Sequence, residues 1–231
     1  FCRVTSGHPD VLERGDMKEY YENPDVVADY SDARFLVKRP RTHRRESAIV
    51  DQFFRIIGRV DRVLDIPCGA GRFQKQLLQN AGAVLEMDYS QAMTRKSREN
   101  FRKDRESDPA RVRFSVGSIL DIPCADKRTD VVFSMRLYHH FPNIEDRVRI
   151  LRELKRAGRK WVILSFYNFW SYQHMRRLLK NARSRRQSRR YAITLRQFHR
   201  EVEEAGLRVR CFRSNARFFS EQTLALLEIP N

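Results

Sequence analysis

Two glycines and an acidic residue stand together where an apolar stretch of the chain ends. Asp65 follows the apolar residues, Gly69 and Gly71 come next, and a helical pattern opens at about Arg72. Glycine lets the backbone approach a ligand closely and adopt a positive φ, and the free N–H groups of a new helix point toward such a turn. The turn therefore suits a nucleotide-like ligand. Because Asp65 would repel a pyrophosphate, we expect a ligand with an amino group rather than a dinucleotide.

A second acidic residue stands at the distance from this turn that nucleotide sites show. The stretch 83–88 has the pattern of a strand that ends in Asp88. In nucleotide-binding βαβ units, an acid about 20 residues after the glycine turn holds the ribose hydroxyls. We therefore predict that Asp88 holds a ribose, and we expect Glu86 to point to the opposite face of the strand. A simple helix cap or turn is the alternative for Asp88.

The segment with Asp65, Gly69 and Gly71 resembles the first motif of class I S-adenosylmethionine (SAM) dependent methyltransferases, in which an acid is followed by G-x-G-x-G. Pro67 stands where this family usually has its first glycine, and proline donates no backbone hydrogen bond. The resemblance implies SAM as the cofactor. It places Asp65 near the amino group of SAM, and it places Pro67, Gly69 and Gly71 in the turn beside the cofactor. For the motif alone, an ordinary strand-to-helix turn remains an equal alternative.

Two further segments extend the resemblance. Tyr89 opens the family's turn after the ribose-binding acid, which implies that it also borders the cofactor. The stretch 112–123 resembles the strand and loop that hold the adenine. Ser118 stands where the family commonly has an acid, and the backbone of Ile119 would supply another adenine contact. A strand end followed by a polar turn is the alternative for Ser118.

The apolar run 129–135 is typical of a central parallel strand, and a Leu-His-His segment often follows the similar strand in the family. Active sites of open α/β sheets lie beyond the carboxyl ends of the strands. We therefore expect Met135 to border the cofactor and Arg136 to border the substrate. A base is needed only if the acceptor must lose a proton. The candidates for this base are Tyr138, His139 and His140. Helix capping or packing is the alternative for the histidine pair, and no metal site is predicted.

The stretch 17–37 carries aromatic residues among polar ones. It resembles the amino-terminal lid of SAM enzymes of the quinone-biosynthesis type, a subgroup that methylates small molecules. In those enzymes an Arg or Tyr of the lid reaches the methionine end of SAM. The resemblance assigns this role to Arg34 and Tyr30, with plain packing of the tyrosine and exposure of the arginine as the alternative.

The charge of the chain is strongly positive and unevenly placed. The net charge is +17, and the stretch 171–190 has eight Lys and Arg residues without an acid. This excess favours an anionic partner such as a nucleic acid, a phosphorylated glycan or a lipid surface. A solvated helix and loop is an equal alternative. Together with Arg136, the predicted substrate residues are Arg185, Arg186, Arg189 and Arg190.

The elements that must position these residues alternate between strands and helices. The predicted strands are 62–66, 83–88, 111–116, 129–135, 160–167, 207–212 and 223–227; the predicted helices are 42–57, 72–81, 91–103, 143–157 and 194–205. This alternation predicts an α/β fold with a parallel sheet and helices on both faces. The resemblance implies a Rossmann-like, doubly wound, seven-stranded and mostly parallel sheet whose last strand is antiparallel.

We expect a single methyltransferase domain over residues 1–231. It would comprise a helical lid and first helix (17–57), a SAM-binding core (60–168), a basic substrate-side insertion after the fifth strand (169–193), and a closing helix and strands (194–231). The scattered cysteines and the lack of a long apolar stretch favour a cytoplasmic protein, with peripheral attachment to a membrane surface as an alternative. The chain begins with Phe1, so attachment to another domain of a longer chain stays open.

The predicted function is SAM-dependent methyl transfer to a small molecule or to an anionic, phosphorylated acceptor. An RNA-directed methyltransferase and a non-catalytic SAM-binding subunit are the alternatives. Methyltransferases that act on base amino groups often carry Asn/Asp-Pro-Pro-aromatic after the fourth strand, whereas this chain has Ser134-Met135-Arg136-Leu137. Methylation of a base amino group is therefore disfavoured, but methylation at other positions is not.

Overall fold

The computed structural model describes residues 40–103, 108–184, 190–214, 216 and 219–230. The predicted lid 17–37 lies outside these residues. Within them, no helix combines the length and the apolar character that crossing a membrane requires.

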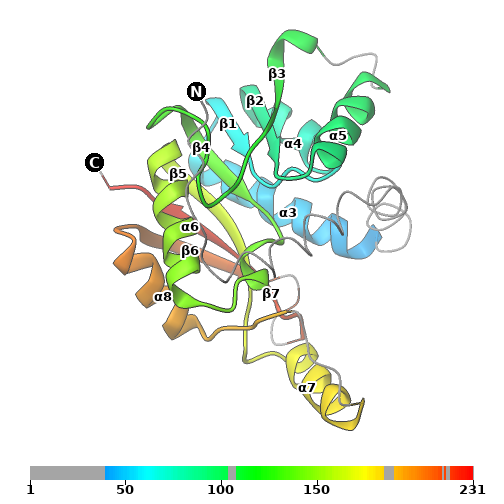
Figure 1. Cartoon of the computed structure of the whole chain (residues 1–231), viewed down its shortest axis with the longest axis vertical. Helices are drawn as coiled ribbons and strands as arrows, with labels where there is room; N and C mark the ends of the chain where they lie inside the picture. The colour runs from blue at the N-terminus through cyan, green and yellow to red at the C-terminus, as the bar shows by residue number, and fades with distance from the viewer. Residues whose placement is uncertain (1–39, 104–107, 185–189, 215, 217–218, 231) are drawn as a thin grey trace, which may run out of the picture.

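Among the described residues, seven strands form one sheet (Figure 1) in the order β3-β2-β1-β4-β5-β7-β6. The strands are β1 (Val60–Asp65), β2 (Ala81–Asp88), β3 (Val112–Val116), β4 (Thr129–Ser134), β5 (Gly158–Tyr167), β6 (Arg208–Ser214) and β7 (Gln222–Glu228). β1 to β5 pair in parallel, whereas β7 runs antiparallel to both of its neighbours. The predicted Rossmann-like, mostly parallel sheet with an antiparallel last strand is confirmed.

Helices cover both faces of this sheet. The helices are α3 (Pro40–Ile57), α4 (Gln74–Asn80), α5 (Gln91–Lys103), α6 (Ile144–Ala157), α7 (Tyr172–Ser184) and α8 (Leu195–Glu204), with short 3₁₀ turns η2 (Pro109–Arg111) and η3 (Tyr138–His140). Apolar side chains of α3, α4 and α5 pack on one face, and those of α6 and α8 pack on the other. The fold is thus doubly wound, as expected.

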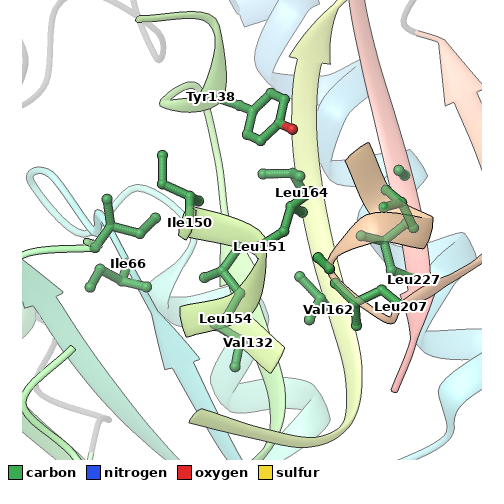
Figure 2. Packing of buried hydrophobic residues seen from close by; sticks show 14 of the residues in the cluster. Ile66, Val132, Tyr138, Ile150, Leu151, Leu154, Val162, Leu164, Leu207 and Leu227 are labelled. Carbon is green, nitrogen blue, oxygen red and sulfur yellow. The ribbon is translucent and has the colours of Figure 1, made fainter. Parts of the chain in front are cut away.

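Strand alternation divides the core into two layers. Val131 and Phe133 of β4 lie in the layer beneath α3 and α4, whereas Val132 lies in the layer with α6 and α8. Successive residues of a strand point to opposite faces, so a central strand that is covered on both faces must be apolar throughout. Figure 2 shows the second layer, in which Leu151 and Leu154 of α6 pack near Val132 and the β5 side chains.

Local sequence signals explain where the helices of the closing segment begin and end. Thr194 caps α8: its Oγ1 accepts from Gln197 N at 3.1 Å, and Gln197 Oε1 accepts from Thr194 N at 3.0 Å. This reciprocal arrangement satisfies two N–H groups at the start of the helix. Gly206 follows the helix at a φ of +71°, a conformation that glycine adopts without strain. The predicted helix 194–205 therefore agrees with α8.

The predicted helix 72–81 is longer than the observed α4, which begins at Gln74 and ends at Asn80. The turn after β1 continues as far as Phe73, because Gly69 and Gly71 both have positive φ and cannot belong to a helix. Ala81 already belongs to β2, where it lies level with Val60 of β1. A long turn and a short helix thus bring the chain back to the sheet.

A candidate active site at the carboxyl ends of the strands

A cavity of about 480 Å³ opens beyond the carboxyl ends of β1, β2 and β4 and beside the loop after β3. Ligands of open α/β sheets bind at this edge. The cavity wall includes most of the residues that the sequence selects. These are Asp65, Pro67, Gly69, Asp88, Tyr89, Ser118, Ile119, Met135, Arg136 and His140.

The two glycines of the turn have different structural roles. Gly69 lines the cavity at a φ of +56°, and a Cβ added there would have no atom within 4 Å. Gly71 has a φ of +78°, but its Cβ would lie 2.5 Å from Ser97 Oγ of α5. Gly71 is not part of the cavity wall, and the structure gives it a packing role against α5, so its place beside the cofactor stays a prediction. It lets the turn approach α5, while Gly69 leaves open space in the cavity.

Asp88 fastens the glycine turn to the end of β2. Its Oδ2 accepts from Gly69 N and its Oδ1 accepts from Ser90 N, both at 2.9 Å. The capping hydrogen bond at the start of α5 comes instead from Ser90, whose Oγ accepts from Met93 N at 3.1 Å. Each carboxylate oxygen has a second lone pair. Asp88 can therefore accept from a ligand hydroxyl while it holds the turn.

Asp65 is a buried acid on the cavity wall. Only 2% of its surface is exposed, and its Oδ1 has no hydrogen-bond partner among the described residues. Burial raises the pKa of Asp65 well above its usual range, and the neighbouring carboxylate of Glu86 raises it further. Removing an anion from water without a partner is unfavourable. A cation in the cavity would relieve this cost.

Glu86 lies beneath the glycine turn, fully buried, where Ser97 Oγ donates to its Oε2 at 3.0 Å. Burial raises its pKa to about 7. The expectation that Glu86 points to the opposite face from Asp88 is wrong, because residues two apart in a strand share a face. Glu86, Asp88 and Asp65 instead form one acidic group, in which each carboxylate makes ionisation of the others less favourable.

The loop after β3 lies at another part of the wall. Ser118 Oγ accepts from Leu120 N at 3.2 Å, and the backbone of Ser118 forms a bridge with Asp121. Asp121 also lines the cavity and is exposed. Of this loop, Ser118 was predicted from the sequence and Asp121 was not, although both residues line the cavity.

Arg136 is held by contacts that come from distant parts of the chain. It has a φ of +60°, and its backbone N donates to Ser165 Oγ at 2.7 Å. Its guanidinium pairs with Glu46 of α3, which also pairs with Arg72 at 2.5 Å. Burial alone would raise the pKa of Glu46, but the guanidiniums of Arg72 and Arg136 hold it below its usual range. This ion network ties α3 to the wall of the cavity.

Tyr138 and His139 are not part of the cavity wall, whereas His140 is. Figure 2 shows Tyr138 above the apolar layer of α6 and β5, and its hydroxyl donates to Glu201 of α8. His139 is 4% exposed and its ring stacks on Tyr167 at a centroid distance of 3.8 Å. Burial, and then the nearby His140 and Arg190, lower the pKa of His139 well below its usual range. Of the three predicted bases, the structure therefore brings His140 to the cavity.

Several predicted site residues lie outside the described part of the chain. They are Tyr30, Arg34, Arg185, Arg186 and Arg189. Their roles, and the quinone-type subgroup that the lid resemblance suggests, stay predictions. Arg190 is described and exposed, but it is not part of the cavity wall. In the described residues, no group of three or more His, Cys, Asp or Glu side chains is arranged to hold a metal ion.

The cavity also contains charged and polar residues that the sequence analysis missed. They are Arg72, Asp121, Asn143, Asp146 and Arg149. Asp146 and Arg149 lie one turn apart in α6, a spacing that places two side chains on one helix face. The sequence contains this signal, but nothing in it shows that this face borders the cavity.

Comparisons with known proteins agree with this geometry. Residues 64–166 match the methyltransferase domain family. A 23S rRNA (uracil(1939)-C(5))-methyltransferase of Paracidovorax citrulli is 30% identical over 103 residues, which is 43% of this chain but 20% of that relative. The chain thus matches about a fifth of the length of this curated relative.

Solved structures share the fold over most of the chain. The magnesium protoporphyrin IX methyltransferase of Synechocystis, solved with bound SAH, has a TM-score of 0.74 at 14% identity and covers 94% of this chain and 100% of its own. A SAM-dependent methyltransferase of Clostridium acetobutylicum has a TM-score of 0.64 at 12% identity and covers 82% of this chain and 92% of its own. With the glycine turn after β1, this sheet order and the family match over residues 64–166, the central part of the chain resembles a methyltransferase domain and has the fold of SAM-dependent methyltransferases.

Proposed function

We propose that this chain transfers a methyl group from SAM to an acceptor that binds beside Met135, Arg136 and His140. The observation that carries the proposal is Asp65. Its buried Oδ1 has no partner among the described residues, and it lines the same cavity as the open space at Gly69. SAM carries an ammonium group and a sulfonium. A cation of this kind would offset the cost of ionising a buried acid.

The residues of the wall fit the parts of SAM. Asp65 would hold the amino group, directly or through water or a backbone relay, and Gly69 would let the backbone pass close to the cofactor. Asp88 would accept from the ribose hydroxyls. The loop with Ser118 and Ile119 would border the adenine, and Asp121 of that loop adds an acceptor for the adenine amino group. When bound, SAM supplies a methyl group that its own sulfonium has already activated.

The remaining task of the protein is to align an acceptor and exclude water. Arg136 stands at the acceptor side with its backbone fixed by Ser165 and its guanidinium fixed by Glu46. Such a fixed guanidinium suits an anionic group on the acceptor. His140 would accept a proton from an acceptor that must lose one.

A specific observation also favours an RNA acceptor as the second candidate. The curated relative is named as an rRNA methyltransferase, and the net charge of this chain is +17. Positive charge supports binding to any polyanion, so it does not separate RNA from a phosphorylated small molecule. A non-catalytic SAM-binding subunit is distinguished by cofactor binding without methylation of either kind of acceptor.

Isothermal titration calorimetry with SAM and with SAH tests the cofactor part of this proposal. The wild-type chain is expected to bind both ligands, and Asp65→Asn is expected to bind SAM at least about tenfold more weakly, because the lost charge-assisted contact is worth about 1.5–3 kcal/mol. Asp61→Asn is the matched control, since Asp61 is exposed at the other end of the same strand. A folded wild-type chain that binds neither ligand would exclude the proposal.

A further inference from the structure

Helix α7 stands apart from the body of the protein. Figure 1 shows it extending from the carboxyl end of β5, away from the sheet. Its first turns are anchored by His174, which is buried, and by Arg177, which pairs with Glu221. Gln173 Oε1 also accepts from Glu221 N at 3.3 Å, but apart from His174 and Arg177 the described side chains of α7 are exposed. The outer residues of α7 therefore contribute little to the hydrophobic core of the protein.

The exposed surface of α7 is nevertheless apolar on one side. Tyr172, Met175, Leu178 and Leu179 follow the spacing that places side chains on one helix face, and Leu179 is 67% exposed. Trp170, which is 66% exposed, and Phe219 lie at the base of the helix, where the ring of Phe219 contacts that of Tyr172. We call this surface the α7 patch. Its members are Trp170, Tyr172, Met175, Leu178, Leu179 and Phe219. Contiguous exposed apolar side chains of this kind mark interaction sites.

Positive charge borders the α7 patch. Arg176 and Lys180 are exposed and lie one helical turn apart on α7. The sequence from Phe169 to Arg190 contains no Asp or Glu. An apolar helix face that is flanked by basic residues, with aromatic residues beside it, is the pattern of helices that lie in the plane of a membrane interface. Trp and Tyr favour the level of the lipid headgroups.

We propose that the α7 patch docks on an anionic lipid bilayer, with α7 lying in the interface and its basic residues against the headgroups. The composition of the patch favours lipid over RNA, because Met175, Leu178 and Leu179 offer RNA neither hydrogen bonds nor rings for stacking, whereas they gain from burial among acyl chains. The same run of positive charge would repel a second copy of α7. An anionic bilayer satisfies both features of this surface.

The place of α7 in the fold gives this docking a direction. α7 follows β5, and β5 runs parallel to β4 and β1. The carboxyl ends of these strands, the cavity and the start of α7 therefore all lie at one edge of the sheet. Docking through α7 would bring this edge toward the bilayer. The inference concerns binding to lipid and does not depend on the methyl-transfer reaction.

Vesicle co-sedimentation of the full chain tests the proposal. The protein is expected to sediment with vesicles of phosphatidylcholine mixed with phosphatidylglycerol and to remain in solution with vesicles of phosphatidylcholine alone. Leu179→Gln is expected to lower partitioning about tenfold because it removes an inserted apolar side chain. Ile56→Gln is the matched control: Ile56 is 44% exposed on α3, away from the patch, and its substitution should leave partitioning unchanged.

A second pair of variants tests the electrostatic part. Arg176→Gln with Lys180→Gln should weaken binding to the mixed vesicles, whereas Arg196→Gln with Arg200→Gln, which removes the same charge from α8, should not. In a Trp161→Phe background, the fluorescence of Trp170 should shift to the blue when anionic vesicles are added and stay unchanged with phosphatidylcholine vesicles. This readout reports insertion directly.

Three outcomes would overturn the proposal. The first is no binding to anionic vesicles by the folded wild-type chain. The second is equal vesicle binding by wild type and Leu179→Gln, together with loss of binding to a single-stranded RNA oligonucleotide in the Arg176→Gln, Lys180→Gln variant, which would identify a nucleic-acid surface. The third is a stable dimer in solution that Leu179→Gln converts to a monomer, which would identify the α7 patch as an interface between two copies.

Discussion

The two sides of the sheet edge carry opposite charge. At the ends of β1 and β2, Asp65, Glu86 and Asp88 form one acidic group. At the ends of β4 and β5, Arg136, Arg177 and Arg190 surround the stacked rings of His139 and Tyr167. The acidic side suits a cation and the basic side suits an anion. The proposed cationic methyl donor and the proposed anionic acceptor would therefore occupy neighbouring places at this edge without competing.

The two sides also differ in how their charges are held. Asp88 accepts hydrogen bonds from Gly69 and Ser90, which belong to the same βαβ unit. The basic side depends on distant partners: Glu46 is 90 residues from Arg136, and Glu221 is 44 residues from Arg177. The acidic side is thus a local construction, whereas the basic side is assembled by the tertiary fold.

The largest effect is expected from the valine substitution of Gly69, which should abolish SAM binding. The side chain would enter the open space of the cavity, and a β-branched residue strongly resists the φ of +56°. Calorimetry measures the binding, and circular dichroism checks the fold.

Gly58→Val is the matched control for the Gly69 variant. Gly58 also has a positive φ, of +79°, and a Cβ there would also have no atom within 4 Å, but Gly58 is not part of the cavity wall. The Gly58→Val variant should be less stable than the wild-type protein but should still bind SAM. Normal SAM binding by Gly69→Val would show that the turn has a structural role alone.

Replacing Asp88 by alanine should weaken SAM binding by about 1–3 kcal/mol, roughly fivefold to 150-fold, because a carboxylate that accepts from ribose is lost. Ser90→Ala separates this effect from a local structural one, since it removes the cap of α5 and leaves the carboxylate in place. Unchanged affinity in a folded Asp88→Ala variant would remove Asp88 from the ribose site.

The acidic group should make SAM binding depend on pH. Glu86 has a pKa of about 7, so this acid becomes ionised as pH rises through this range, and the pKa of the neighbouring Asp65 is raised by burial as well. A bound cation favours the ionised forms, so SAM affinity should rise between about pH 6 and pH 8, with proton release on binding. Calorimetry in two buffers of different ionisation enthalpy measures that release. Glu86→Gln should reduce the pH dependence, and a wild-type affinity that falls with rising pH would contradict this prediction.

The same pKa shift has a consequence for the stability of the protein without ligand. The folded-state pKa of Glu86 lies above its value in the unfolded chain. The contribution of Glu86 to the free energy of unfolding is therefore fully present at pH values below about 4.5 and is lost as pH rises through about 7. At pH 8, Glu86→Gln should raise the free energy of unfolding by on the order of 2 kcal/mol. Denaturant unfolding measures this, with the exposed Glu99→Gln as control.

The smallest effect is expected on the basic side. Neutralising Arg185, Arg186, Arg189 and Arg190 to Gln should raise the KM for an anionic acceptor by roughly threefold to tenfold and flatten its dependence on salt. SAM affinity should stay unchanged. A control variant with Arg196, Arg200, Arg208 and Arg210 changed to Gln removes the same charge from α8 and β6. An unaltered KM across salt concentrations would leave this run without a role in acceptor binding.

The difference between local and distant contacts also explains what the sequence could predict. Gly69 and Asp88 could be selected from the sequence because their spacing reflects a single βαβ unit, and the seven-stranded, mostly parallel sheet with an antiparallel last strand follows from the family resemblance. The pairing of Glu46 with Arg72 and Arg136 could not be predicted from the sequence, because nothing in the residues of α3 indicates which loop this helix covers. Tyr138 and His139 were selected by their distance from β4, but the direction of each side chain depends on α8 and Tyr167.

The position of β7 between β5 and β6 has a consequence during synthesis of the protein. β5 ends at Tyr167, but the strand that covers its open edge begins only at Gln222. Until that segment leaves the ribosome, β5 presents a row of unpaired backbone groups beside strongly apolar side chains, a template for pairing with another chain. During the interval between the synthesis of Tyr167 and of Gln222, this open edge therefore exposes the nascent chain to misassociation.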